Sequence, residues 1–125
     1  ERFLDWLIVT WSEPDRAVFR RRDIYELFLL DMQEVFSQEH AAEGLSQELM
    51  IYRVYGFSPG DLSRDQRVVV WHGLSDTIVP PSMAWAMARA LPNCEVHLVP
   101  GGHFMAVDAA EQIIARLRQM LDASP

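Results

Sequence analysis

Lysine is absent from this chain of 125 residues, and cysteine occurs once, as Cys94. A single cysteine excludes a disulfide within the chain and a zinc site built from several cysteines. Acidic residues outnumber basic ones, giving a formal net charge of −7. Nucleic acids and anionic membranes bind basic surfaces, so this balance argues against either as a partner. The one basic run, at 20–22, we interpret as a solvated link between helices.

Long apolar runs are also missing, and no segment has the roughly 20 consecutive apolar residues that a membrane-spanning helix needs. The apolar stretch at 3–9 is short, is interrupted by Asp5 and lacks the pattern of a secretory signal. We therefore expect a cytoplasmic protein. Half of the residues are hydrophobic, which indicates a folded domain. Because the first residue is Glu rather than Met, we expect a fragment or a processed product.

The first sixty residues favour helices, and the remainder favours alternating strands and helices. Helices are expected at about 1–11, after Ser12, at 23–38 and at 41–55, the last broken near Gly44. Ser12 and Asp23 suit helix N-caps, and Asp15 suits the positive end of the helix that follows Ser12. A turn-rich linker at 56–65 follows these helices. We therefore expect a helical region at 1–60 and an α/β region at 61–125.

Two short apolar segments in the second region predict strands. The segment at 67–71 is nearly all apolar, as expected of a strand that is buried on both faces, and the second strand is expected at 95–99. A helix capped by Ser82 lies between them, and another is expected at 106–121. A strand–helix–strand unit of this kind predicts parallel pairing, which places the carboxyl ends of both strands on one edge of the sheet.

Each strand ends in a glycine-containing turn, and the two turns present Asp76 and His103 at the edge where α/β sheets do their chemistry. Histidine takes and returns protons near neutrality, and a carboxylate bonded to it fixes its tautomer. We interpret Asp76 and His103 as candidate catalytic residues, against the alternatives of a turn-forming Asp and a loop or helix-capping His. His72 would allow a metal site, but no third ligand is apparent, so we expect neither a metal nor a cofactor.

These turns resemble the α/β-hydrolase fold family. The family pattern HG-x-x-D-x-x-V-P and its histidine turn G-G-H are matched here by His72, Gly73, Asp76, Val79 and Pro80, and by Gly101, Gly102 and His103. The resemblance implies that 1–60 form a helical cap, or lid, and that 61–125 form the carboxyl-terminal part of the hydrolase core. It also implies a nucleophile–His–Asp triad whose nucleophile, usually Ser, precedes the cap.

One serine matches the G-x-S-x-G nucleophile motif, Ser58 in the sequence Gly56-Phe-Ser-Pro-Gly60. We reject it because a predicted helix rather than a strand precedes it, and because Pro59 has no N–H for an oxyanion hole. Only eighteen residues separate Ser58 from Asp76, too few for the elements that the fold places between them. The nucleophile is therefore expected upstream of Glu1.

The expected function is that of a hydrolase acting on ester, thioester or amide bonds of a small-molecule substrate. The chain alone should be inactive, because it lacks the nucleophile and the oxyanion hole. The expected partner is the missing amino-terminal part of the core, or a second copy through self-association, because two strands cannot satisfy their own edges. The alternative is a non-catalytic binding or interaction module with a degenerate or incomplete hydrolase core.

Overall fold

A computed structural model describes residues 2–53, 56 and 58–122, except for the side chains at 45, 52 and 53. Four helices come first, α1 (Arg2–Val9), α2 (Glu13–Phe19), α3 (Arg22–Ser37) and α4 (Ala41–Arg53), and a short 3-10 helix, η1 (Pro59–Asp61), follows. The chain then alternates through β1 (Val68–Gly73), α5 (Ser82–Ala90), β2 (Cys94–Val99) and α6 (Ala106–Asp122). Among the described helices, none is long and apolar enough to cross a membrane.

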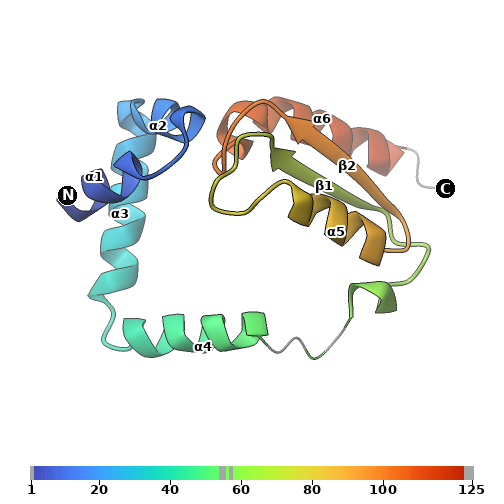
Figure 1. Cartoon of the computed structure of the whole chain (residues 1–125), viewed down its shortest axis with the longest axis horizontal. Helices are drawn as coiled ribbons and strands as arrows, with labels where there is room; N and C mark the ends of the chain where they lie inside the picture. Colours follow the sequence, from blue (N-terminus) through green and yellow to red (C-terminus); the bar gives the residue numbers. More distant parts are fainter. Residues whose placement is uncertain (1, 54–55, 57, 123–125) are drawn as a thin grey trace.

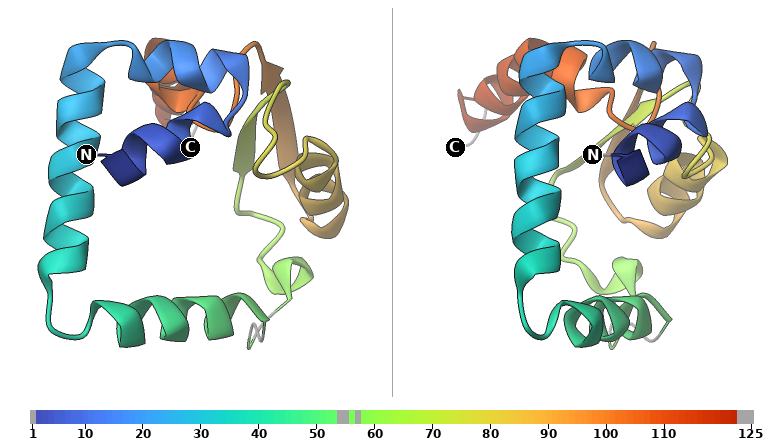
Figure 2. Two further views of the ribbon diagram at one scale, coloured as in Figure 1. Left: turned by 60° about the vertical axis from the view of Figure 1, so that its left-hand side comes forward. Right: turned by 90° about the vertical axis from the view of Figure 1, so that its left-hand side faces the viewer.

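The two strands form a parallel sheet, in register from Val68 opposite Cys94 to Gly73 opposite Val99, which confirms the predicted pairing. Helices α5 and α6 cover opposite faces of this sheet (Figures 1 and 2). On the α6 side, Arg116 Nε donates to both carboxylate oxygens of Glu95 at 3.2 Å. The prediction that the first strand is buried on both faces is wrong, because its residues before Gly73 are only half-buried.

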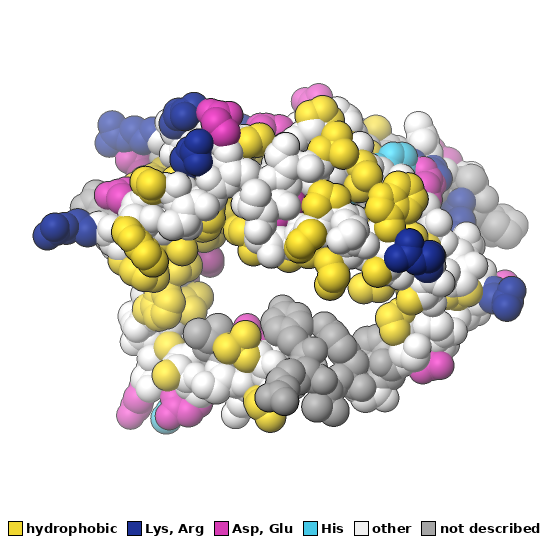
Figure 3. Space-filling model, in the orientation of Figure 1, with side chains coloured by type: hydrophobic (Ala, Val, Ile, Leu, Met, Phe, Trp, Pro, Cys, Tyr) yellow, Lys and Arg dark blue, Asp and Glu magenta, His cyan; other side chains and the backbone are white. Residues whose placement is uncertain are grey.

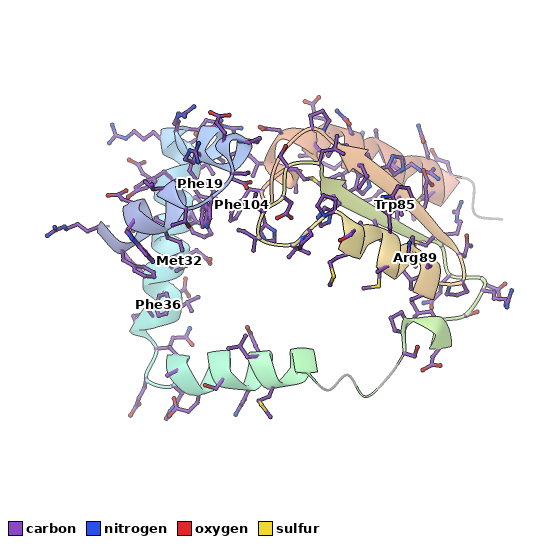
Figure 4. The ribbon with its side chains drawn as sticks, in the orientation of Figure 1. Phe19, Met32, Phe36, Trp85, Arg89 and Phe104 are labelled. Carbon is purple, nitrogen blue, oxygen red and sulfur yellow. The ribbon has the colours of Figure 1, made fainter. Side chains whose placement is uncertain are left out.

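Helices α1, α2 and α3 pack around a small aromatic core. Trp11, Val18 and Phe19 are buried there, and Phe28 of α3 and Phe104 from the loop after β2 pack against them. The ring of Phe104 lies 4.8 Å from Trp11 and 4.8 Å from Phe19, centroid to centroid, within the range that stabilises aromatic pairs. Figure 4 shows the rings of Phe19 and Phe104 side by side. The loop after β2 is therefore part of the helical core.

Of the three predicted N-caps, one is confirmed and two are wrong. Ser12 caps α2, and its hydroxyl oxygen accepts a hydrogen bond from the N–H of Asp15, as predicted. The predicted caps at Asp23 and Ser82 are wrong: Asp23 lies inside the first turn of α3, and Ser82 is already the first residue of α5. Neither of these two helices has a side-chain hydrogen bond that caps its start. A polar residue near a helix start is therefore not sufficient to identify an N-cap.

Helix α4 runs without interruption across Gly44, so the predicted break there is wrong. A single glycine inside a helix costs only about 1 kcal/mol relative to alanine, which thirteen helical residues can tolerate. The predicted end of this helix at Tyr55 lies outside the described residues. In Figure 1 α4 lies across the end of α3 and well away from the sheet.

Several large apolar side chains on the helices are exposed. The exposed side chains on α3, α5 and α6 include Leu27, Leu30, Val35, Met83, Trp85, Met87, Ile114 and Leu117. Apolar side chains line the upper rim of the opening in Figure 3 and continue over α5. On α3 and α6 these exposed side chains lie along one side of the helix, and among the described residues little packs against those sides.

The close packing of the two turns gives a stability prediction. A Cβ added at Gly73 would lie 2.1 Å from the carbonyl oxygen of Gly102, whereas a Cβ at Gly44 would meet nothing within 4 Å. We expect Gly73→Ala to lower the free energy of unfolding by about 1–3 kcal/mol through overpacking. Gly44→Ala should raise it by about 0.5–1 kcal/mol. Chemical denaturation measures both, and equal effects of the two substitutions would contradict the packing described here.

Candidate active site

The two turns at the carboxyl ends of the strands lie side by side. The N–H of Leu74 donates to the carbonyl of Val99 at 2.9 Å, continuing the ladder beyond β1. The N–H of Ser75 then donates to the carbonyl of Gly101 at 2.8 Å. Because these two bonds tie the first turn to the second, the residues that follow in each turn are held next to each other.

Asp76 and His103 meet at this point. His103 Nδ1 lies 3.0 Å from Asp76 Oδ2, which is a hydrogen-bonding distance. A bond from Nδ1–H to the carboxylate leaves Nε2 as the proton-accepting nitrogen of the ring. The Asp76 side chain is 4% exposed, whereas that of His103 is 37% exposed. One end of the pair is therefore buried in the fold while the imidazole is open to solvent.

The carboxylate of Asp76 has further donors. Its Oδ1 accepts hydrogen bonds from the backbone N–H groups of Ile78 and Val79, both at 2.9 Å. Burial by itself would raise the pKa of Asp76, but the bonds from Val79, His103 and Ile78 outweigh it and lower the pKa below its ordinary value. Asp76 is therefore ionised near neutrality and able to stabilise a protonated imidazole.

His72 supports the same turn. Its Nε2 lies 2.9 Å from the Val79 carbonyl, to which it can only donate, and 3.4 Å from Asp76 Oδ2. The side chain is 13% exposed. His72 thus joins the end of β1 to the backbone beyond Asp76 and lies beside its carboxylate. In the described part of the chain, no group of three or more His, Cys, Asp or Glu side chains is arranged to hold a metal ion.

Sequence reasoning missed two residues next to the histidine turn. Asp15 was assigned to the start of a helix, yet it is completely buried and accepts the N–H of Phe104 at 2.9 Å. Phe104 was not singled out, yet its ring lies 5.3 Å from the imidazole of His103 and packs against the aromatic core. An acidic residue in a first helical turn is common, so no local signal distinguished Asp15.

Ser58 has a local structural role. Its Oγ accepts the N–H of Gly60 at 3.3 Å, and its own N–H donates to Asp61 at 2.8 Å, which forms the capping box of η1. Gly60 lies against the carbonyl of Ala90, at the carboxyl end of α5. Helix α5 has nine residues and is therefore about 13 Å long at 1.5 Å per residue, and the Asp76 turn precedes its amino end. This placement agrees with the rejection of Ser58 as the nucleophile.

Comparison with known proteins adds one finding. A family model described as alpha/beta hydrolase fold matches residues 10–110, more than half of the chain. The chain belongs to the α/β-hydrolase fold family. A search of curated proteins and a search of solved structures each found no match. Proteins of this family are generally enzymes, so membership suggests hydrolase-type function for the protein that carries this chain.

The lowered pKa of Asp76 gives a prediction about stability and pH. A carboxyl group with a lowered pKa in the folded state stabilises the fold above its unfolded pKa, and this stabilisation is lost as the pH falls through the folded value. We therefore expect the difference in unfolding free energy between the wild type and Asp76→Asn to shrink as the pH falls below about 4.

Denaturant titrations between neutral pH and about pH 3 measure this difference. Asp108→Asn serves as the control, because that carboxylate is exposed and its ion pair with Arg21 contributes little. A stability difference for Asp76→Asn that stays constant over the whole range would contradict the assignment.

Proposed function

We propose that the protein is a hydrolase for ester, thioester or amide bonds that uses a nucleophile–His103–Asp76 triad. The observation that carries the proposal is the 3.0 Å bond between His103 Nδ1 and Asp76 Oδ2 at the carboxyl edge of parallel strands. His103 acts as general base and then as general acid. Asp76 orients the ring. The nucleophile belongs to a segment outside these 125 residues.

The chemistry follows from the two ring nitrogens. Nε2 of His103 accepts the proton of the nucleophile's hydroxyl as the oxygen attacks the acyl carbon, and the carbonyl π electrons move onto the oxygen. The imidazolium, stabilised by Asp76 through Nδ1–H, then gives that proton to the leaving group as the tetrahedral intermediate collapses. Water repeats the cycle, with Nε2 taking a proton from water and returning it to the nucleophile. Oxyanion stabilisation comes from donors outside this chain.

The proposal assigns 1–60 to a cap and 61–125 to the carboxyl-terminal part of the core. In its support, the helical region contacts the second region at the histidine turn, where Phe104 enters the aromatic core, and through the ion pair between Arg21 and Asp108 of α6. An apolar hollow of about 380 Å³ lies between α3 and Phe104, lined partly by Ile24, Leu27 and Val107. His103 and Asp76 do not line the hollow, so it is suited to an apolar part of a small-molecule substrate away from the reacting bond.

The second candidate is a non-catalytic binding module with an incomplete hydrolase core. The observation in its favour is that no hydroxyl or thiol among the described residues is hydrogen-bonded to His103. The two candidates differ in whether a nucleophile elsewhere in the protein reaches Nε2. Activity measurements separate them directly.

We expect the full protein to hydrolyse members of an ester panel, and these 125 residues alone to be inactive. His103→Ala and Asp76→Asn should each lower kcat by about 100- to 10,000-fold, because general acid–base catalysis and control of the tautomer are lost. Ser58→Ala should change kcat little and is the matched control, since Ser58 caps η1. Activity of the isolated chain that disappears with Ser58→Ala would make Ser58 the nucleophile instead. Full activity of His103→Ala would contradict the proposed triad.

We also expect the isolated chain to associate, because its exposed apolar helix sides and open strand edges lack cover. Sedimentation velocity over a dilution series should show species larger than a monomer of 14.4 kDa. Ile114→Glu combined with Leu117→Glu should shift the distribution toward monomer, since both side chains are about half exposed on α6. Gln112→Glu combined with Gln119→Glu adds the same two negative charges at exposed polar positions of α6 and should not. A dispersed wild-type monomer would contradict this expectation.

A further inference from the structure

Asp15 is the largest side chain in the described residues that is completely buried. Its Oδ1 accepts the N–H of Phe104 at 2.9 Å, and its Oδ2 accepts the hydroxyl of Ser12 at 2.5 Å. Burying a carboxyl group is costly unless hydrogen bonds compensate, and truncating one partner of a buried polar pair is strongly destabilising. Both oxygens are satisfied here, and one of the two donors belongs to the histidine turn.

The same carboxylate packs against the backbone on the other side of His103. A Cβ at Gly102 would lie 2.1 Å from Asp15 Oδ2, so only a glycine leaves space for the carboxylate at this distance. Gly102 and Phe104 are the two residues that flank His103. Asp15 therefore restrains the backbone immediately before and immediately after the histidine.

This restraint complements the one from the core. Asp76 holds the His103 ring through Nδ1, whereas Asp15 holds the backbone from the side of α2. The Phe104 ring, packed against Trp11 and Phe19, adds an apolar contact on that side. The histidine turn is thus held from two sides, and on the second side Asp15 is 89 positions from Phe104 in sequence.

We propose that Asp15 is a positioning residue, which sets the backbone of the histidine turn so that His103 Nδ1 faces Asp76 and Nε2 faces the nucleophile. This inference rests on the proposed function of His103 as the general base. Asp15 has no contact with the imidazole nitrogens in this arrangement, and it acts through Gly102 and Phe104. Small misplacements of a catalytic group reduce rate far more than they reduce substrate binding.

The first test uses three variants of the full protein. Asp15→Ala removes both acceptors and should lower kcat by about 10- to 100-fold with little change in KM. Asp15→Asn keeps a side-chain oxygen for the Phe104 N–H, and its amide can donate to Ser12 Oγ, so it should retain kcat within about 3-fold. Asp108→Asn is the control, an exposed carboxylate that also joins the helical region to α6 through Arg21. An unchanged kcat for Asp15→Ala, or an effect on KM alone, would overturn the proposal.

The second test does not depend on activity. Proton NMR of protein labelled with nitrogen-15 histidine reports the hydrogen bond between His103 Nδ1–H and Asp76. We expect Asp15→Ala to shift or broaden this resonance, and Asp15→Asn and Asp108→Asn to leave it unchanged. If no variant has activity but Asp15→Ala still alters the resonance, the positioning role stands and the proposed function fails. A resonance that Asp15→Ala leaves unchanged overturns the positioning role itself.

A further substitution covers the case in which Asp15→Ala does not fold. Gly102→Ala introduces a methyl group against the carboxylate and should lower kcat and shift the same resonance. Gly60→Ala is its control, because a Cβ there meets its nearest neighbour at an ordinary 3.4 Å. If Gly102→Ala matches Gly60→Ala in both kcat and the His103 resonance, Asp15 does not position the histidine.

Discussion

The parallel register between β1 and β2 is the constraint on which the site depends. Gly73 lies opposite Val99, so both strands end at the same level and their turns begin side by side. A slip of one residue would displace one turn by about 3.3 Å and direct its side chains to the opposite face. The 3.0 Å contact between Asp76 and His103 could not survive such a displacement. The bond from Ser75 to Gly101 ties the turns together beyond the strands and so protects this register.

The strands, the crossover helix and the pairing of Asp76 with His103 were predictable from the sequence. Each depends on local signals: short apolar runs, glycine-containing turns and an order of elements that admits one simple topology. The resemblance of the two turns to the hydrolase family pointed to the same residues. Local pattern was sufficient to bring these two residues to the same edge of the sheet, because each lies in the turn that directly follows its strand.

The rest could not be predicted, because it depends on contacts between distant segments. The bond between Asp15 and Phe104 joins two residues separated by 89 positions, and nothing near Asp15 signals its burial. The spacing of apolar residues in α3 and α6 is visible in the sequence, but it cannot show whether anything covers them. Leu30 and Leu117 belong to these apolar sides, and both are more than half exposed.

The contacts at the histidine turn bear on what a cap does in the proposed enzyme. At the histidine turn, Asp15 of α2 lies against Gly102, and the Phe104 ring lies among the aromatic rings of the helical region. A helical region attached in this way cannot move relative to the core without disturbing the backbone on either side of His103. On the proposed mechanism, the segment that borders the substrate hollow therefore also sets the direction of the general base. Substrate contacts with α3 would then be communicated to Nε2 through α2 and the histidine turn, which couples recognition to proton transfer within one continuous packed unit.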